Sequence, residues 1–281
     1  MAPVLKGARC SNIFIYGKTG TGKTAVTKYV LSRLEAKAKD VNAAVKFCYV
    51  NCRLAGTEYR VFTSLCQSIG LHVPFTGLSA GEVFDRFRTN LDSSKLIFII
   101  ALDEVDALIK ARGDMLLYEL TRINETLCNS KVSLIGISND LRLKEFLDPR
   151  VLSSLSEEEI VFRPYDAEEL KNILLERAQL AFCAGVLSEG ALRLCAALAA
   201  AEHGDARRAL DLLRVAGEVA ERMDANVVAE EHVREAEKII EHNRVVETLA
   251  NLTLHSKLVI LSVYHLGKAN GYRAITGEIC D

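Results

Sequence analysis

A glycine-rich segment near the N-terminus constrains the fold of this chain more than any other feature. Residues 17–24 read Gly-Lys-Thr-Gly-Thr-Gly-Lys-Thr, directly after the apolar run Ile13–Tyr16 and before a helical pattern. They match G-x-x-x-x-G-K-[ST] in the strand, loop and helix context that gives this motif its meaning. Glycines let successive backbone N–H groups point at phosphate oxygens, and the start of the next helix adds its positive dipole end. We therefore predict a site for a nucleoside triphosphate; the alternative is an ordinary glycine-rich turn.

Two side chains of this loop have predicted chemical roles. Lys23 would reach the β- and γ-phosphates of ATP, and the Thr24 hydroxyl would ligate Mg²⁺. The predicted nucleotide-binding residues of the loop are Gly17, Lys18, Thr19, Gly20, Thr21, Gly22, Lys23 and Thr24.

Composition excludes several classes of protein. The eight cysteines are scattered without a C-x-x-C pair, and a phosphate loop implies an intracellular setting, so we expect reduced thiols rather than disulfides or zinc. No apolar run approaches the roughly 20 residues that cross a bilayer, and no hydrophobic signal core begins the chain. We expect a soluble, cytoplasmic protein without membrane contact. The net charge of −2 argues neither for nor against nucleic acid.

The first part of the chain has the pattern of an α/β domain. Short apolar runs alternate with helical stretches, which predicts a parallel sheet with helices on both faces. Because the runs are nearly all apolar, we expect strands that are covered on both sides. The predicted strands are Ile13–Tyr16, Val45–Val50, Leu96–Ala101, Val132–Ile137 and Ile160–Phe162. The predicted helices between them are Lys23–Ala38, Glu58–Ile69, Ala80–Leu91 and Met115–Thr126.

The pattern changes at Pro164, which breaks any continuing regular structure. The chain then reads as an all-α bundle rich in Ala and Leu, and a further helix at Leu254–Leu266 opens a third region. We predict domains at residues 1–163, 164–241 and 242–281. The predicted helices of the bundle are Ala167–Ala184, Ser188–Glu202, Asp205–Met223 and Ala229–Glu241.

An acidic pair, Asp103 and Glu104, follows the apolar run Leu96–Leu102. At the carboxyl edge of a parallel sheet, such acids face the crevice where ligands bind. We predict that Asp103 holds the Mg²⁺ shell and that Glu104 orients and polarises the attacking water. The alternative is a solvated helix start, which the upstream phosphate loop makes the weaker interpretation.

Three further polar residues have predicted catalytic roles. Asn139 follows another strand and would sense the γ-phosphate and the water; the alternative is a turn residue. Arg150, after Pro149, would project toward a neighbouring subunit's nucleotide as a finger in trans, rather than serve as a surface arginine. Arg207, with Arg208 as second choice, lies in the first turn of a predicted helix, where a positive charge is unfavourable for the helix dipole. We therefore predict that it contacts an anionic ligand; the alternative is a salt bridge on the helix.

In this order, the motifs resemble those of the AAA+ ATPases, and within them the archaeal origin-recognition replication initiators, homologous to eukaryotic origin-recognition and cell-division-control loading proteins. The resemblance extends over nearly the whole chain. The segments that carry it are Ser11–Thr24, Tyr49-Val50-Asn51-Cys52, Leu102-Asp103-Glu104-Val105-Asp106, Ile137-Ser138-Asn139-Asp140, Pro149-Arg150-Val151 with Ser153-Ser154-Leu155, and Gly204-Asp205-Ala206-Arg207.

The resemblance implies a Walker A motif at Gly17–Thr24, a Walker B motif at Asp103-Glu104, sensors at Asn139 and Arg207, and a helical lid from about Pro164 in which Tyr165 contacts the nucleotide. It also implies DNA binding by a C-terminal winged helix and by a helical insertion within Ser68–Asn90, where Arg86 and Arg88 would contact phosphates or remain solvated.

The chain departs from the family pattern at both ends. Of the N-terminal extension that packs by the adenine in the family, only Met1–Ser11 remain here. A winged helix that began near Asn243 would finish well past residue 281, so we expect its start alone and weak, poorly selective DNA binding.

Three functions fit these observations. The favoured one is an ATP-dependent initiator that binds double-stranded origin DNA and recruits or loads the replicative helicase, with slow hydrolysis as the switch. The others are a signalling ATPase that controls a protein partner and a clamp-loader-like or helicase-like motor. Rapid steady turnover with DNA would indicate a motor, whereas retained ADP would indicate a switch.

Overall fold

A computed structural model describes residues 2–74, 77–155 and 158–269 of the chain. Two units are distinguished by their internal contacts. The first comprises Met1–Asp166 with Glu202–Ala206, and the second comprises Ala167–Ala201 with Arg207–Asp281. The short segment Glu202–Ala206 therefore returns to the first unit, which also contains the glycine-rich loop.

The first unit is built on a five-stranded sheet with the order β2-β3-β4-β1-β5, in which every pair of neighbours is parallel. The predicted apolar runs are all confirmed as strands, with ends that differ by at most two residues. The strands are β1 (Ile13–Gly17), β2 (Val45–Asn51), β3 (Ile97–Asp103), β4 (Lys131–Ser138) and β5 (Glu158–Phe162).

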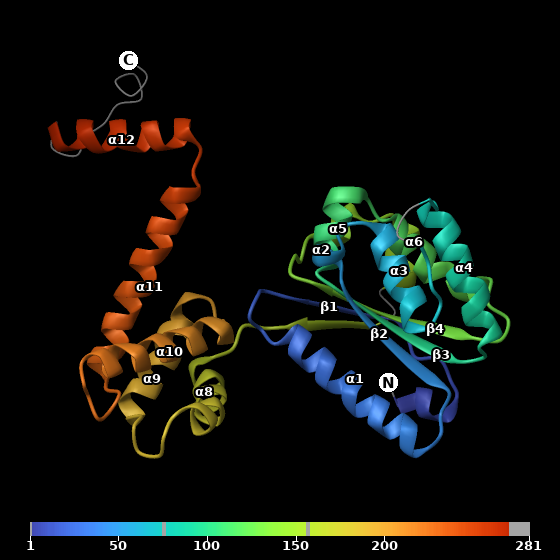
Figure 1. Ribbon diagram of the computed structural model, residues 1–281, viewed down its shortest axis with the longest axis horizontal. Coiled ribbons are helices and arrows are strands. Elements are labelled where there is room, and N and C mark those ends of the chain that lie inside the picture. The colour runs from blue at the N-terminus through green and yellow to red at the C-terminus, as the bar shows by residue number, and fades with distance from the viewer. Residues whose placement is uncertain (1, 75–76, 156–157, 270–281) are drawn as a thin grey trace. The chain divides into compact units, whose positions relative to one another are not determined.

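Helices cover both faces of this sheet, as predicted (Figure 1). One face carries α1 (Lys23–Asp40), whose Leu31 and Leu34 pack with Ile99 and Ile137 of the sheet. On the opposite face, Val61, Phe87 and Leu117 of three helices pack against Phe98 and Leu102 of β3. The helices of this face are α2 (Cys52–Ala55), α3 (Glu58–Ser68), α4 (Ala80–Ser93), α5 (Val105–Arg112), α6 (Met115–Arg122) and α7 (Pro149–Leu155).

The local structure differs from the sequence prediction in a few places. The short helices α2, α5 and α7 were not predicted, and the helix predicted over Met115–Thr126 ends at Arg122 and continues as a 3-10 turn, η2 (Ile123–Glu125). Two further 3-10 turns are η1 (Ala2–Lys6) and η3 (Leu143–Phe146).

Burial follows strand position in the sheet. Every residue of the inner strand β3, which lies between β2 and β4, is buried, as an apolar run covered on both sides requires. The edge strand β5 is different, because Ile160 and Val161 are 42% and 68% exposed. The prediction that all strands are covered on both sides is therefore wrong for β5, which has one neighbouring strand only.

The second unit is entirely helical in its described residues, as the Ala- and Leu-rich pattern predicts. Its helices bury small and branched side chains against one another, among them Leu174, Cys195, Leu213 and Val233. Its helices are α8 (Ala167–Ala181), α9 (Glu189–Glu202), α10 (Ala206–Arg222), α11 (Glu230–Asn251) and α12 (Leu254–Ala269).

The helix α11 extends beyond Glu241, where the sequence pattern predicts its end. No Gly or Pro interrupts it over Glu230–Asn251, so no residue with a strong tendency to end a helix stands at Glu241. The predicted division into a lid and the start of a winged helix at residues 241–242 stays a prediction. The final part of that segment, residues 270–281, lies outside the described residues.

Candidate nucleotide-binding site

The glycine-rich loop connects β1, which ends at Gly17, to α1, which begins at Lys23. Gly20 and Gly22 have φ of 74° and 85°, a left-handed conformation that glycine adopts without steric cost. Gly22 is the N-cap of α1 and no side chain caps this helix end. The first N–H groups of an uncapped helix are donors for an anion, so the local structure suits a phosphate.

Lys23 lies inside this loop and is only 4% exposed. Its Nζ donates to the carbonyl oxygens of Gly17 at 2.8 Å and Lys18 at 2.6 Å. The Thr21 hydroxyl also donates to the Lys18 carbonyl, at 2.9 Å. A buried ammonium beside an uncapped helix N-terminus forms a strongly positive cradle, which fits a polyphosphate.

Two residues from distant parts of the chain lie against the loop glycines. A Cβ atom on Gly20 would stand 1.7 Å from Oδ1 of Asp205, and one on Gly22 would stand 2.5 Å from the Tyr165 hydroxyl oxygen. The Ala206 backbone N–H donates to the Gly20 carbonyl at 3.2 Å. Tyr165 thus lies beside the glycine-rich loop, and its contact with the nucleotide stays a prediction. The approach of Asp205 to the loop has no signal in the sequence.

The acidic pair meets the loop through Asp103. The Thr24 hydroxyl donates to Oδ2 of Asp103 at 2.7 Å, and the Glu104 backbone N–H donates to Oδ1 at 2.9 Å. Asp103 is 3% exposed. A hydroxyl and a carboxylate in contact are the hard oxygen ligands that Mg²⁺ takes from protein when phosphates supply the others. Among the described residues no group of three or more His, Cys, Asp or Glu side chains could hold a metal ion.

Glu104 is held in an unusual conformation at the start of α5. Its φ is 50°, in the left-handed region that few residues other than glycine adopt. Its Oε1 accepts a hydrogen bond from the Asn51 amide at 3.2 Å, and its Oε2 is 3.6 Å from the Arg53 guanidinium. Strained backbone of this kind concentrates at functional sites.

Strand β2 supplies contacts to both acids. Tyr49 donates its hydroxyl to Oδ2 of Asp103 at 2.6 Å, and Asn51 contacts Glu104 as described above. Burial, followed by the neighbouring Asp103, raises the pKa of Tyr49 well above its usual range, so the phenol remains a donor. Neither residue has a role predicted from the sequence, although polar residues at the carboxyl end of an apolar run are the signal that identified Asp103.

Asn139 follows β4, directly after Ser138, which pairs with Tyr16 of β1. Its backbone N–H donates to Oδ1 of Asp106 at 3.2 Å. The next residue, Asp140, forms a 2.5 Å ion pair with Lys110. These two contacts fix the end of β4 to α5, the helix that begins beside Glu104. The structure therefore places Asn139 at the same sheet edge as the loop and the acidic pair.

Arg150, the predicted finger, lies apart from this cluster at the start of α7. Its guanidinium hydrogen bonds go to both carboxylate oxygens of Asp148, each at 3.1 Å. This pairing lowers the pKa of the Asp148 carboxyl. The Arg150 Cζ atom also stands 5.8 Å from the ring centroid of Tyr118.

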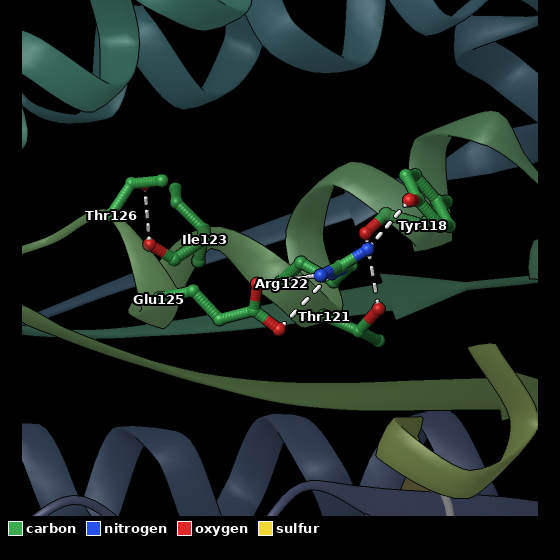
Figure 2. A network of polar contacts seen from close by, with 6 residues as sticks. All are labelled: Tyr118, Thr121, Arg122, Ile123, Glu125 and Thr126. Carbon is green, nitrogen blue, oxygen red and sulfur yellow. Dashed lines mark hydrogen bonds and ion pairs between the residues drawn. The ribbon is translucent and has the colours of Figure 1, made fainter. Parts of the chain in front are cut away.

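A second arginine, Arg122, contacts the same aromatic ring. Figure 2 shows its guanidinium between the Tyr118 hydroxyl, 2.7 Å away, and the carboxylate of Glu125, which accepts from Nη2 at 2.8 Å. Its Cζ atom is 5.4 Å from the Tyr118 centroid. Two arginines, each with its own carboxylate, therefore lie around one partly buried aromatic side chain.

The remaining predicted residues belong to other parts of the molecule. Arg207 and Arg208 lie in the first turn of α10, in the second unit. Arg86 and Arg88 lie on α4, where Arg88 forms a 2.8 Å ion pair with Asp85. In residues 2–74, 77–155 and 158–269 we find no helix long and apolar enough to span a membrane.

Comparisons with known proteins agree with this arrangement. A family model described as an AAA domain matches residues 7–144, and one described as the Cdc6 AAA+ ATPase-type lid domain matches residues 171–238. A curated protein of Sulfolobus acidocaldarius, called ORC1-type DNA replication protein 1, is 50% identical over 281 residues, which are 100% of this chain and 70% of that protein.

Solved structures give the same result. The Aeropyrum pernix ORC1 protein in complex with DNA is 53% identical with a TM-score of 0.83, over 99% of this chain and 72% of that one. The Aeropyrum pernix ORC2 protein in its ADPNP–ADP complexes is 25% identical with a TM-score of 0.74, over 99% of this chain and 74% of the other.

Proposed function

This chain belongs to the family of ORC1-type DNA replication proteins, and we therefore propose that it initiates DNA replication in the cytoplasm as a switch controlled by ATP. ATP binding would permit engagement of double-stranded origin DNA and recruitment or loading of the replicative helicase. Slow, Mg²⁺-dependent hydrolysis to ADP would end that state. The proposal rests on one observation above all: the 2.7 Å contact that joins Thr24 of the phosphate loop to Asp103 of the acidic pair.

We assign the binding of nucleotide to the loop and its neighbours. Lys23 now donates to two neutral carbonyl oxygens, and an incoming phosphate would compete with them for its ammonium. Charge-assisted hydrogen bonds to an anion are about twice as strong as neutral ones, so the phosphate would win. Thr24 and Asp103 would hold Mg²⁺, which would neutralise charge on the phosphates when bound. Tyr165 and the glycines would bound the pocket.

We assign hydrolysis to Glu104, which would orient and polarise the attacking water. For this its carboxylate has to exchange contact with Asn51 for contact with water. Asn139, at the same edge, would sense the γ-phosphate. Arg207 would supply a second sensor, and Arg150 would act on the nucleotide of a neighbouring copy. For DNA, Arg86 and Arg88 of α4 present cations to phosphates.

Steady-state hydrolysis tests the switch against a motor. We expect slow turnover that duplex DNA does not accelerate and ADP that stays bound after purification. Glu104→Gln should still bind ATP, while its turnover falls by about 10²–10⁴, the usual contribution of a general base. The measurements are phosphate release with and without DNA and chromatographic identification of the retained nucleotide.

The control is Glu35→Gln, which removes an exposed carboxylate of α1 whose partner is Lys39. It should turn over like the unmodified protein. Fast hydrolysis stimulated by DNA would contradict the switch, and unchanged turnover in Glu104→Gln would remove this residue from catalysis.

A further inference from the structure

Three elements converge on the carboxylate of Asp103. Its Oδ2 accepts hydroxyl hydrogens from Thr24 of α1 at 2.7 Å and from Tyr49 of β2 at 2.6 Å. Its Oδ1 accepts the Glu104 backbone N–H at 2.9 Å. Because Asp103 is only 3% exposed, these donors replace the water that a free carboxylate would bind.

The position of Tyr49 follows from the register of the sheet. Asn51 of β2 pairs with Asp103 of β3, and side chains two residues apart on a strand lie on the same face. Tyr49 therefore lies on the face of Asp103, with its ring under Lys28, whose Nζ is 4.1 Å from the ring centroid. Lys28 is one helical turn after Thr24, so α1 contacts both Tyr49 and Asp103.

The direction of the Thr24 hydrogen bond matters for a cation. A hydroxyl ligates a metal ion through an oxygen lone pair, so its hydrogen must point elsewhere. In this structure the hydrogen goes to Oδ2 of Asp103, which leaves the Thr24 lone pairs for the ion. This arrangement depends on Asp103 keeping its present rotamer.

We propose that Tyr49 is a positioning residue of the metal site: its hydroxyl holds Asp103 in the rotamer that accepts the Thr24 hydrogen. The inference rests on the proposed binding of ATP and Mg²⁺. Tyr49 would lower the Mg²⁺ concentration that nucleotide binding requires. It would make no contact with the nucleotide itself. The edge strand β2 would thereby contribute to a site whose recognised residues come from α1 and β3.

The test measures affinity rather than turnover. A fluorescent, non-hydrolysable ATP analogue is titrated into the unmodified protein and into Tyr49→Phe, first with EDTA and then at increasing Mg²⁺. Affinity in EDTA should agree within about two-fold, because the phosphate loop is intact. The Mg²⁺ concentration for half-maximal tightening should rise by about ten-fold or more, the effect of losing one hydrogen bond to a charged group. Phenylalanine keeps the ring under Lys28.

The matched control is Tyr59→Phe. Tyr59 lies on α3 and donates its hydroxyl to the Pro74 carbonyl, so this variant also loses one hydrogen-bonded phenol in the same unit. Its Mg²⁺ requirement should be that of the unmodified protein. The proposal is overturned if Tyr49→Phe keeps the ordinary Mg²⁺ requirement, or if Tyr59→Phe changes it equally. If the unmodified protein binds no analogue at all, the proposed ATP-binding function fails. That result differs from one in which the unmodified protein binds the analogue and only the role of Tyr49 is refuted.

Discussion

Lys23 shows how a single residue connects the loop sequence to its chemistry. Its ammonium is almost entirely buried, and a buried charge is costly unless hydrogen bonds replace its water. The carbonyl groups of Gly17 and Lys18 accept from it, and they do so because the glycine-rich backbone turns them toward the same point. The loop therefore satisfies the cation through neutral oxygens, which a phosphate can replace.

We predict that Lys23→Ala abolishes ATP binding, because it removes the side-chain cation that would contact the β- and γ-phosphates. A loss of at least about 2–3 kcal/mol in binding free energy is expected for a charge-assisted contact. Calorimetric titration with ATP and Mg²⁺ measures it. Lys37→Ala, which removes an exposed lysine later on α1, should bind ATP normally. Unchanged affinity in Lys23→Ala would contradict the assignment of the loop.

The sequence predicts some site residues and misses others for a physical reason. The loop and the acidic pair are contiguous motifs, so their residues are recognised from local order alone. The contacts of Tyr49 and Asn51 with the acidic pair depend on the pairing of β2 with β3, which no local pattern encodes. Asp205 meets Gly20 only because the chain returns to the first unit after α9.

At the scale of elements, β1 and β4 approach each other through a glycine. Gly136 of β4 pairs with Phe14 of β1, and a Cβ atom on Gly136 would stand 2.4 Å from Cε2 of the Phe14 ring. Phe14 is fully buried and contacts Tyr16, with ring centroids 4.3 Å apart. Because the Phe14 ring lies in a closely packed core, moving it away from an added Cβ atom would cost free energy, which favours glycine at position 136.

We predict that Gly136→Ala destabilises the protein by about 1–3 kcal/mol, the usual cost of overpacking a core. Gly81→Ala is the matched control, because Gly81 lies in α4 with open space around its Cα. There the same change should stabilise by up to about 1 kcal/mol through helix propensity. Urea unfolding followed by circular dichroism measures both. Equal midpoints for the two variants would refute the close approach of Phe14 to Gly136.

The strands and the long helices were predicted well from their patterns of apolar residues, whereas the short helices were not. The five strands coincide with short runs that are mostly apolar, and such runs are recognised from composition. Helices α2, α5 and α7 have four to eight residues, too few for a 3.6-residue period to become visible. The exposure of β5 was not predicted, because an apolar run in the sequence does not indicate whether the strand lies inside the sheet or at its edge.

At the scale of the whole molecule, the surface around Tyr118 bears on association between copies. Arg150 lies there with its side chain 71% exposed and paired with Asp148. An exposed ion pair contributes little stability, so exchange of Asp148 for a neighbour's phosphate would cost the fold little. Arg122, on the same ring, is held more firmly by Glu125 and by Tyr118 itself (Figure 2).

We predict that Arg150→Ala lowers ATP turnover by about 10³ at protein concentrations where chains associate, and leaves the turnover of the monomer unchanged. The reason is that a finger in trans stabilises charge in the transition state of a neighbouring site. Turnover is measured across a dilution series whose association is followed by light scattering. Arg122→Ala, the control, should match the unmodified protein throughout. A defect in the dilute monomer would refute a role in trans.

The contacts of Asp205 and Ala206 with Gly20 can form only late in the synthesis of the chain. A ribosome makes the phosphate loop and both acids long before it reaches Gly204, and a nascent domain begins to fold as soon as enough of it has emerged. The sheet can therefore assemble while residues 204–206, which lie against the glycine-rich loop, are still untranslated. A chain arrested before residue 204 would have a folded core whose glycine-rich loop lacks the contacts of Asp205 and Ala206.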